Sequence, residues 1–300
     1  MGRETASAAL ARAPMPADVL ELLKPVTWFP PMWAFFCGVV SSGIPLTERW
    51  AFLVGGVLLA GPLVCGTSQA VNDWFDREVD AINEPGRPIP SGRIPGRWGL
   101  WIAIAGTLLS LLVAALLGPW VLAATILGLL LAWAYSAPPR RLKRSGWWGP
   151  LACAFAYEGL TWFTGAAVML GTLPGTPILV LAALYAAGAF GIMTLNDFKA
   201  VEGDRQMGIA SLPVVLGERA AALLACAVML AAQLAVIGVL LLWGLELTAA
   251  IVAALTAVQL LSMRKLLRDP AAHAPWYNGA GVSLFVLGML VSAIGVRGLG

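Results

Sequence analysis

The chain has 300 residues, of which 59% are hydrophobic and 12% are charged, and its mean hydropathy is +0.82. Soluble domains carry about twice that share of charged residues, so this composition excludes an ordinary water-soluble domain. The net charge of +3 gives no reason to expect a nucleic-acid partner, and a single histidine, His273, excludes a metal site built from histidines.

The segment 1–20 is rich in Ala and Pro and lacks the apolar core of a cleaved signal peptide, so we expect a flexible cytoplasmic tail. The remainder, 21–300, is expected to form one transmembrane domain. A helix needs about 20 mostly apolar residues to cross a bilayer. The fold that we predict is therefore all-α, a lipid-embedded bundle of about nine spanning helices, with spans at 25–43, 50–71, 98–117, 119–136, 149–171, 176–196, 219–242, 245–263 and 278–296.

Basic residues indicate which helix ends face the cytoplasm. With the N-terminus placed inside, every Lys and Arg except Arg49 and Arg297 falls in the tail or in a cytoplasmic loop. Cytoplasmic loops of membrane proteins carry such an excess of positive charge. We therefore predict a cytoplasmic N-terminus and cytoplasmic polar loops.

A first acidic motif follows the second span. Its members are Asn72, Asp73, Asp76 and Asp80; Asn72 and Asp73 are adjacent, and the other separations are three, four, seven and eight residues, which places the four on one side of a helix. Carboxylates on one face repel one another, and no Lys or Arg of that face lies among them, so a bound cation is expected. Oxygen ligands in small number suit Mg²⁺ completed by substrate phosphates. The alternative is a solvated helix end without a ligand.

A second acidic motif follows the sixth span and repeats the first. It also opens with an Asn-Asp pair, Asn196-Asp197, and it continues to Asp204. Asp197 and Asp204 are seven residues apart and share one face if the segment is helical, whereas Glu202 lies off that face. Gly203 weakens a helix, and in an unwound segment Glu202 would turn inward instead. We favour the helical form and expect Asp197 and Asp204 to bind metal.

Phosphate binding also needs fixed positive charges, and several lie on the same side of the membrane. Arg141 and Lys143 are the strongest candidates because they follow a rigid run, Tyr135-Ser136-Ala137-Pro138-Pro139. For each basic residue the alternative is the cytoplasmic charge excess alone. The predicted diphosphate-binding residues are Lys24, Arg77, Arg87, Tyr135, Arg141 and Lys143.

Glu158 lies in the middle of the fifth span. A carboxylate at that depth costs about 3 kcal/mol on insertion scales, so it must be protonated or partnered. We predict an intramembrane functional role for Glu158, and the alternative is a structural hydrogen bond to a neighbouring helix.

The continuous strings from Asn72 to Gly92 and from Asn196 to Arg205 resemble the two Asp-rich motifs of the UbiA-type intramembrane prenyltransferases, in particular the branch of chlorophyll and bacteriochlorophyll synthases. The opening from Leu23 to Trp33 is most similar to the bacteriochlorophyll synthases. In the wider family the second motif is Asp-x-x-x-Asp, and its first position corresponds to Ala200 here. The pigment branch shares this shift, so the resemblance carries the role to Asp197.

The resemblance implies transfer of a geranylgeranyl or phytyl group from its diphosphate to the propionate carboxylate of bacteriochlorophyllide a. It implies Mg²⁺ as cofactor, a bacterial cytoplasmic or intracytoplasmic membrane as location, and pigment-biosynthesis or pigment-binding proteins as candidate partners. It also implies that Asp76 and Asp204 are the central catalytic carboxylates, with Asn72, Asp73, Asp80 and Asp197 beside them at the metal.

Three alternatives stay open at this point. Two are enzymes, a chlorophyll synthase and a prenyltransferase that acts on a quinone or haem precursor. The third comes from another class, a non-enzymatic membrane transporter. The acidic residues lie at helix ends and not at the midplane where transporter sites are found, which disfavours the transporter.

Overall fold

A computed structural model describes residues 13–299, and this part of the chain is almost entirely helical, with no β-strand. The expected all-α membrane fold is therefore confirmed. Residues 1–12, which make up most of the predicted flexible tail, lie outside the described residues. Helix α2 (Pro16–Leu22) covers the last positions of that segment, because a proline at its first position and Asp18 in its first turn both favour a helix start.

The described residues form two compact units. The first holds the residues up to Met32 together with Val54–Arg141, and the second holds Trp33–Leu53 together with the chain from Leu142 onward. Each acidic motif lies in a different unit.

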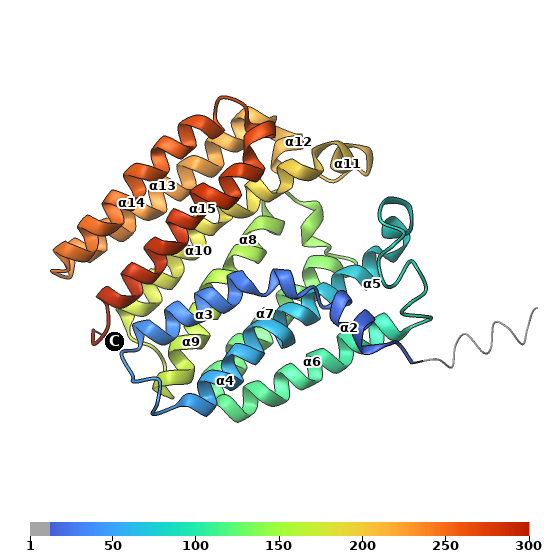
Figure 1. The fold of residues 1–300 in the computed structure, drawn as a ribbon, viewed down its shortest axis with the longest axis horizontal. Coiled ribbons are helices and arrows are strands. Elements are labelled where there is room, and N and C mark those ends of the chain that lie inside the picture. The colour runs from blue at the N-terminus through green and yellow to red at the C-terminus, as the bar shows by residue number, and fades with distance from the viewer. Residues whose placement is uncertain (1–12, 300) are drawn as a thin grey trace, which may run out of the picture. The chain divides into compact units, whose positions relative to one another are not determined.

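The first unit is built around a long helical run that ends in the first acidic motif. Two further helices, α6 and α7, pack against the last part of this run (Figure 1). The short N-terminal elements also contact the run. The elements are α2, the 3-10 turn η1 (Pro25–Thr27), α4 (Trp50–Leu58, from Val54), the π-helix η2 (Leu59–Cys65), α5 (Gly66–Asn83), α6 (Trp98–Leu117) and α7 (Pro119–Ser136).

Small and polar residues hold α6 against its neighbours. A methyl group at Gly106 would overlap the hydroxyl of Thr67 on α5, so the glycine permits the close approach of the two helices. On its other side, α6 accepts a hydrogen bond at Thr107 Oγ1 from Trp133 Nε1 of α7, at 3.1 Å. Such contacts, and not hydrophobic burial, hold helices together in lipid.

The second unit is arranged around α10, which packs against α8, η4, α13 and α15 (Figure 1). Its core includes three buried aromatic rings: Trp162 stacks on Tyr185, and Phe285 meets Tyr185 edge to face. The elements are α3 (Phe29–Ser41, from Trp33), η3 (Leu142–Arg144), α8 (Trp148–Ala154), the π-helix η4 (Phe155–Leu160), α9 (Thr161–Leu170), α10 (Thr176–Asn196), the 3-10 helix η5 (Asp197–Ala200), α11 (Val201–Gln206), α12 (Leu212–Leu216), α13 (Glu218–Leu242), α14 (Glu246–Leu266) and α15 (Pro270–Gly295).

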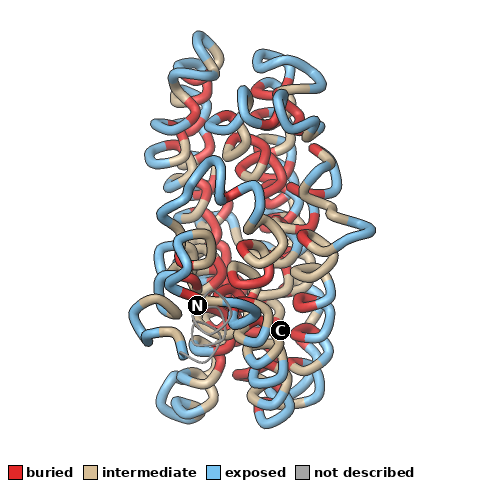
Figure 2. The backbone as a smooth tube through the Cα atoms, turned by 90° about the vertical axis from the view of Figure 1, so that its right-hand side faces the viewer, coloured by how far each residue is buried: buried red, intermediate tan, exposed pale blue. Residues whose placement is uncertain are grey.

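Seven described helices are long and apolar enough to cross a bilayer. Along the helices, buried positions alternate with exposed ones (Figure 2). On α6 the exposed positions include Leu108, Leu112 and Leu116, which recur every four residues and therefore form one apolar stripe. Together with the seven apolar helices, this is the surface of a multi-pass membrane protein, because lipid removes such a stripe from water.

The count of nine spans is not reproduced. The first expected span, 25–43, contains only the 13-residue helix α3, because its first part is a 3-10 turn that starts after Lys24 in a left-handed conformation. The fifth, 149–171, is helical from Trp148 to Leu170 but is interrupted by the π-helix η4, and it is not among the seven. The polar residues of that interruption, including Glu158, lower its apolar character.

Candidate functional site

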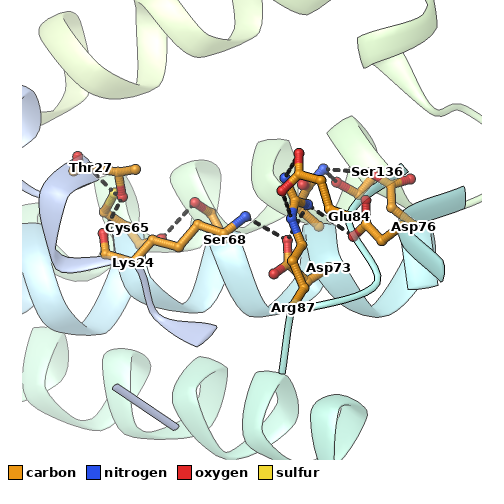
Figure 3. Close-up of polar contacts among 11 residues, drawn as sticks. Lys24, Thr27, Cys65, Ser68, Asp73, Asp76, Glu84, Arg87 and Ser136 are labelled. Carbon is orange, nitrogen blue, oxygen red and sulfur yellow. Dashed lines mark hydrogen bonds and ion pairs between the residues drawn. The ribbon is translucent and has the colours of Figure 1, made fainter. Parts of the chain in front are cut away.

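The first acidic motif lies near the end of α5 (Figure 3). Asp73 and Asp80 are buried, while Asn72 and Asp76 are half-buried. Helix α5 ends shortly before Pro85, since proline disfavours helical backbone in the residue that precedes it. The helical period thus brings the carboxylates to one region, as the spacing predicted.

Two basic side chains reach these carboxylates from outside the helix (Figure 3). Lys24 Nζ lies 2.7 Å from Asp73 Oδ1. Arg87 Nη1 lies 3.4 Å from Asp73 Oδ1 and 2.9 Å from Asp80 Oδ2, and the same guanidinium binds both oxygens of Glu84. Burial alone would lower the pKa of Arg87, but the hydrogen bond to Glu84 and the charges of Asp73 and Asp80 raise it above its ordinary value.

The expectation that no cation lies near this acidic face is therefore wrong. The reason is tertiary: Lys24 precedes the helix by more than forty residues and Arg87 follows it in a loop, so the helical period could not reveal them. Lys24 and Arg87 therefore partly balance the repulsion among the carboxylates. That repulsion alone does not require a bound metal ion.

The donor set nevertheless fits a divalent cation. Asp73 Oδ2 is buried and has no hydrogen-bond partner, although Asp73 Oδ1 is bound to Lys24. Asp76 and the amide oxygen of Asn72 add hard oxygen donors. Within 13–299 no group of three or more His, Cys, Asp or Glu side chains could hold a metal by itself. Mg²⁺ is commonly held by one or two carboxylates and completed by water and phosphates, so this set suits a phosphate-dependent site.

Two further predicted phosphate ligands of the first unit are Arg77 and Tyr135. Arg77 does not point to the carboxylates: its guanidinium lies over the Trp74 ring, 4.4 Å from the centroid, and donates to Trp74 O and to the exposed Glu78. Tyr135 is half-buried at the end of α7.

Arg141 and Ser136 link the end of α7 to the acidic motif. Asn72 Nδ2 donates to Asp76 Oδ2 and to Ser136 Oγ, each at 3.2 Å. Arg141 Nη2 donates to Phe75 O at 2.9 Å, and Arg141 Nε donates to Ser136 O at 3.2 Å. Arg141 therefore ties the loop after α7 to α5, beside the predicted metal ligands.

A second arginine of the loop after α5 was not predicted to have a structural role. Arg93 Nη1 donates to Asp18 Oδ1 at 2.7 Å, and Arg93 Nη2 donates to Glu21 Oε1 at 2.7 Å and to Gly86 O at 2.8 Å. The hydrogen bond from Arg93 lowers the pKa of the Glu21 carboxyl. Arg93 therefore connects the loop after α5 to α2.

Arg87 is less exposed than Arg93. We therefore expect replacement of Arg87 to lower the free energy of unfolding more than replacement of Arg93. Arg87→Gln leaves the buried Asp73 and Asp80 with less compensation, so the free energy of unfolding should fall by about 2 kcal/mol, less than for a fully buried pair because Arg87 is partly exposed. Arg93→Gln should lower it less, because Arg93 is more exposed than Arg87 and its partner Glu21 is half exposed, although Asp18 is largely covered. The Tm of the detergent-solubilised variants measures both, and an equal loss for the two would contradict the role given to burial.

The second acidic motif lies in the second unit, directly after α10. Its residues remain helical, as favoured, but Asp197 opens a tighter 3-10 turn before α11 begins. Asp204 is buried, and it lies near enough to Asp197 for the two charges to repel each other. Glu202 faces outward, where it accepts hydrogen bonds from Arg205 and Gln206. The unwound alternative, with Glu202 turned inward, is not what this segment adopts.

Two other predicted residues belong to the same unit. Lys143 is half-buried in the short turn η3. Glu158 is buried in the π-helix η4, and its Oε2 atom has no hydrogen-bond partner. An expected structural hydrogen bond through that oxygen is therefore not formed. π-Helical turns are frequent at functional sites.

Sequence reasoning missed Asn278, which lies on α15. Its Nδ2 donates to Asn196 Oδ1 at 2.9 Å, directly beside Asp197. The two asparagines are 82 residues apart, so no local pattern could have connected them.

Comparisons with known proteins show what the chain is similar to. Residues 27–291 match the model of the UbiA prenyltransferase family. The chain is 61% identical to the bacteriochlorophyll synthase 33 kDa chain of Cereibacter sphaeroides, with 95% of each chain covered. It is 40% identical to the chloroplastic chlorophyll synthase of Oryza sativa, with 92% of this chain and 75% of that one covered. Its fold is similar to the structure of a UbiA homolog from Archaeoglobus fulgidus bound to GPP and Mg²⁺, with a TM-score of 0.71, 21% identity, and coverage of 92% and 99%.

Proposed function

The chain belongs to the UbiA prenyltransferase family, and we propose that it esterifies the propionate carboxylate of bacteriochlorophyllide a with a geranylgeranyl or phytyl group taken from the prenyl diphosphate. The observation that carries this proposal is the high identity, over nearly the full length of both chains, to a bacterial bacteriochlorophyll synthase chain. The plant chlorophyll synthase is more distant, which favours the bacteriochlorin over the chlorin as acceptor.

The acidic motifs support a divalent cation in this reaction. In the first unit, Asp76 would be the central ligand, with Asn72, Asp73 and Asp80 around it; in the second unit, Asp204 and Asp197 would act in the same way. We propose Mg²⁺, which when bound would neutralise the charge that develops on the departing diphosphate. The buried, unpartnered Asp73 Oδ2 is the observation that fits such an ion.

Fixed cations would hold the diphosphate. Lys24 and Arg87 already form ion pairs with the carboxylates of the first motif. Their side chains can therefore also donate hydrogen bonds to phosphate oxygens bound beside these carboxylates. We propose Arg141, Lys143 and Tyr135 as further phosphate contacts. Arg77 is the least supported of the set, because it lies over the Trp74 ring.

The acceptor needs no strong general base. A propionate is already ionised near neutral pH, so its oxygen can attack directly. The bond between the allylic carbon and the diphosphate oxygen breaks, a carbon–oxygen ester bond forms, and diphosphate leaves with the bonding electrons. The sequence agrees, because its single histidine, His273, lies away from both motifs in the chain.

One cross-over assay tests the function. Purified protein is incubated with geranylgeranyl or phytyl diphosphate and with bacteriochlorophyllide or chlorophyllide, each in turn. We expect ester formation to be fastest with bacteriochlorophyllide. Faster reaction with chlorophyllide would favour the chlorophyll synthase, and no ester with either pigment would favour a quinone- or haem-directed enzyme or a transporter.

We further propose that the chain lies in the bacterial inner membrane with its N-terminus and both acidic motifs on the cytoplasmic side. The sidedness of Lys and Arg supports this orientation. Arg144→Cys should react with a membrane-impermeant thiol reagent only from the cytoplasmic side, and Arg297→Cys only from the periplasmic side. Both positions are exposed. The reverse labelling pattern in intact cells would contradict the orientation.

A further inference from the structure

Two hydrogen bonds join α10 to α15, and they differ in what surrounds them. One links Tyr185 Oη to Ser292 Oγ at 2.8 Å, deep in the aromatic core. The other links Asn278 Nδ2 to Asn196 Oδ1 at 2.9 Å. Asn196 is the last residue of α10, and Asp197 of the second acidic motif follows it immediately.

Helix α15 presents Asn278 from a fixed position. The preceding residue, Tyr277, is fully buried and accepts a hydrogen bond at its hydroxyl from Gln259 Nε2 of α14, at 2.8 Å. Further along α15, Trp33 Nε1 donates to Val286 O at 3.1 Å. These contacts restrain both the rotation and the sliding of α15, so Asn278 can hold the end of α10 in place.

The contact leaves one acceptor unused. Asn278 Oδ1 is buried and has no hydrogen-bond partner. An unsatisfied buried acceptor is unfavourable because it has lost its hydrogen bond to water, and such atoms are rare in native proteins. The amide nitrogen of Asn196 meets only the thioether of Met193, at 3.8 Å, which is a weak acceptor. The asparagine pair therefore has unused hydrogen-bonding capacity beside the carboxylates of the second motif.

We propose that Asn278 is a positioning residue for the second acidic motif. Its amide fixes the end of α10 and thereby the 3-10 turn that begins with Asp197, and its free Oδ1 accepts a hydrogen bond from water in the coordination shell of the divalent cation. Metal ligands depend on such outer contacts. The inference rests on the proposed function only in that it assumes a divalent cation at Asp197 and Asp204.

The test compares the two α10–α15 hydrogen bonds. Asn278→Ala removes the bond beside the motif, and Tyr185→Phe removes the bond in the core with little change of shape. A structural role alone predicts that both variants lose Tm and that neither changes metal affinity. The proposal predicts that only Asn278→Ala weakens metal binding.

Metal binding is measured with Mn²⁺ as a paramagnetic substitute for Mg²⁺, by electron paramagnetic resonance, in the presence of a non-reactive geranylgeranyl thiodiphosphate. We expect Asn278→Ala to weaken Mn²⁺ binding about tenfold, the lower end for an outer-shell contact. Asn196→Ala should give a similar loss, and the double variant should lose no more than either single one, because the two residues act as a pair. Wild-type affinity in Asn278→Ala, or an equal loss in Tyr185→Phe, would overturn the proposal.

The readout also separates this inference from the proposed function. If the wild-type protein binds Mn²⁺ and the affinity depends on Asn278, but no pigment ester forms, the proposed reaction fails and the positioning role stands. If ester forms at the wild-type rate in Asn278→Ala with unchanged Mn²⁺ affinity, the reaction stands and the positioning role fails.

Discussion

Asp76→Asn is expected to lower the rate of prenyl transfer by about 100-fold while the folded protein remains in the membrane. The substitution removes a charged oxygen ligand but keeps the shape of the side chain and an oxygen that can accept from Asn72, which now lies 3.2 Å from Asp76 Oδ2. Asp76 is only half-buried, so the packing of α5 should not suffer. Initial rates with geranylgeranyl diphosphate and bacteriochlorophyllide measure the effect, and an unchanged Tm verifies the fold.

Glu78→Gln is the matched control for this prediction. Glu78 lies on the same helix two residues away, carries the same charge, and is exposed beside Arg77. Its replacement should leave the rate within about twofold of wild type, because surface ion pairs contribute little. Chelation should abolish the wild-type activity and Mg²⁺ should restore it. Full turnover in EDTA, or equal losses in the two variants, would show that Asp76 has no part in metal-dependent catalysis.

The parts of the site that depend on one helix could be predicted from the sequence. The spacing of Asp73, Asp76 and Asp80 determines their common side as soon as α5 is helical, and the helix is confirmed. The contacts of Lys24 and Arg87 could not be predicted, because they depend on how a preceding segment and a following loop fold back onto α5.

Helix boundaries show the same limit. The last span was predicted from residue 278, where the apolar segment begins. Helix α15 nevertheless begins at Pro270, where Asp269 Oδ1 accepts a hydrogen bond from Ala272 N and caps the first turn. The helix thus contains Pro275 in its first two turns and extends to Asn278 and beyond. The apolar pattern alone could not place this first, more polar part of the helix, because its start depends on the Asp269 cap.

At the second motif, Asp204→Ala and Asp197→Ala are each expected to lower kcat/KM by about 10–100-fold, the usual effect of losing a metal ligand or its outer contact. Asp204 is buried, and its charge is close enough to Asp197 to repel it, so a cation between them would relieve an unfavourable interaction in the folded state. Lys199 only partly offsets the repulsion. Steady-state kinetics on the variants, with Tm as the check on folding, measure the effect.

Glu202→Ala supplies the control, because Glu202 lies two residues before Asp204 but faces outward toward Arg205 and Gln206. It should leave kcat/KM within about twofold of wild type, since an exposed ion pair contributes little. The three variants separate two geometries of this segment. If the helical form seen here is the working form, Asp197 and Asp204 act together and Glu202 is dispensable. If the segment unwinds at Gly203 when substrate binds, Glu202 turns inward and Glu202→Ala becomes the severe variant. Near-normal kinetics in Asp197→Ala would place the metal-binding role on a different residue, because the 3-10 turn would then hold Asp197 away from the cation.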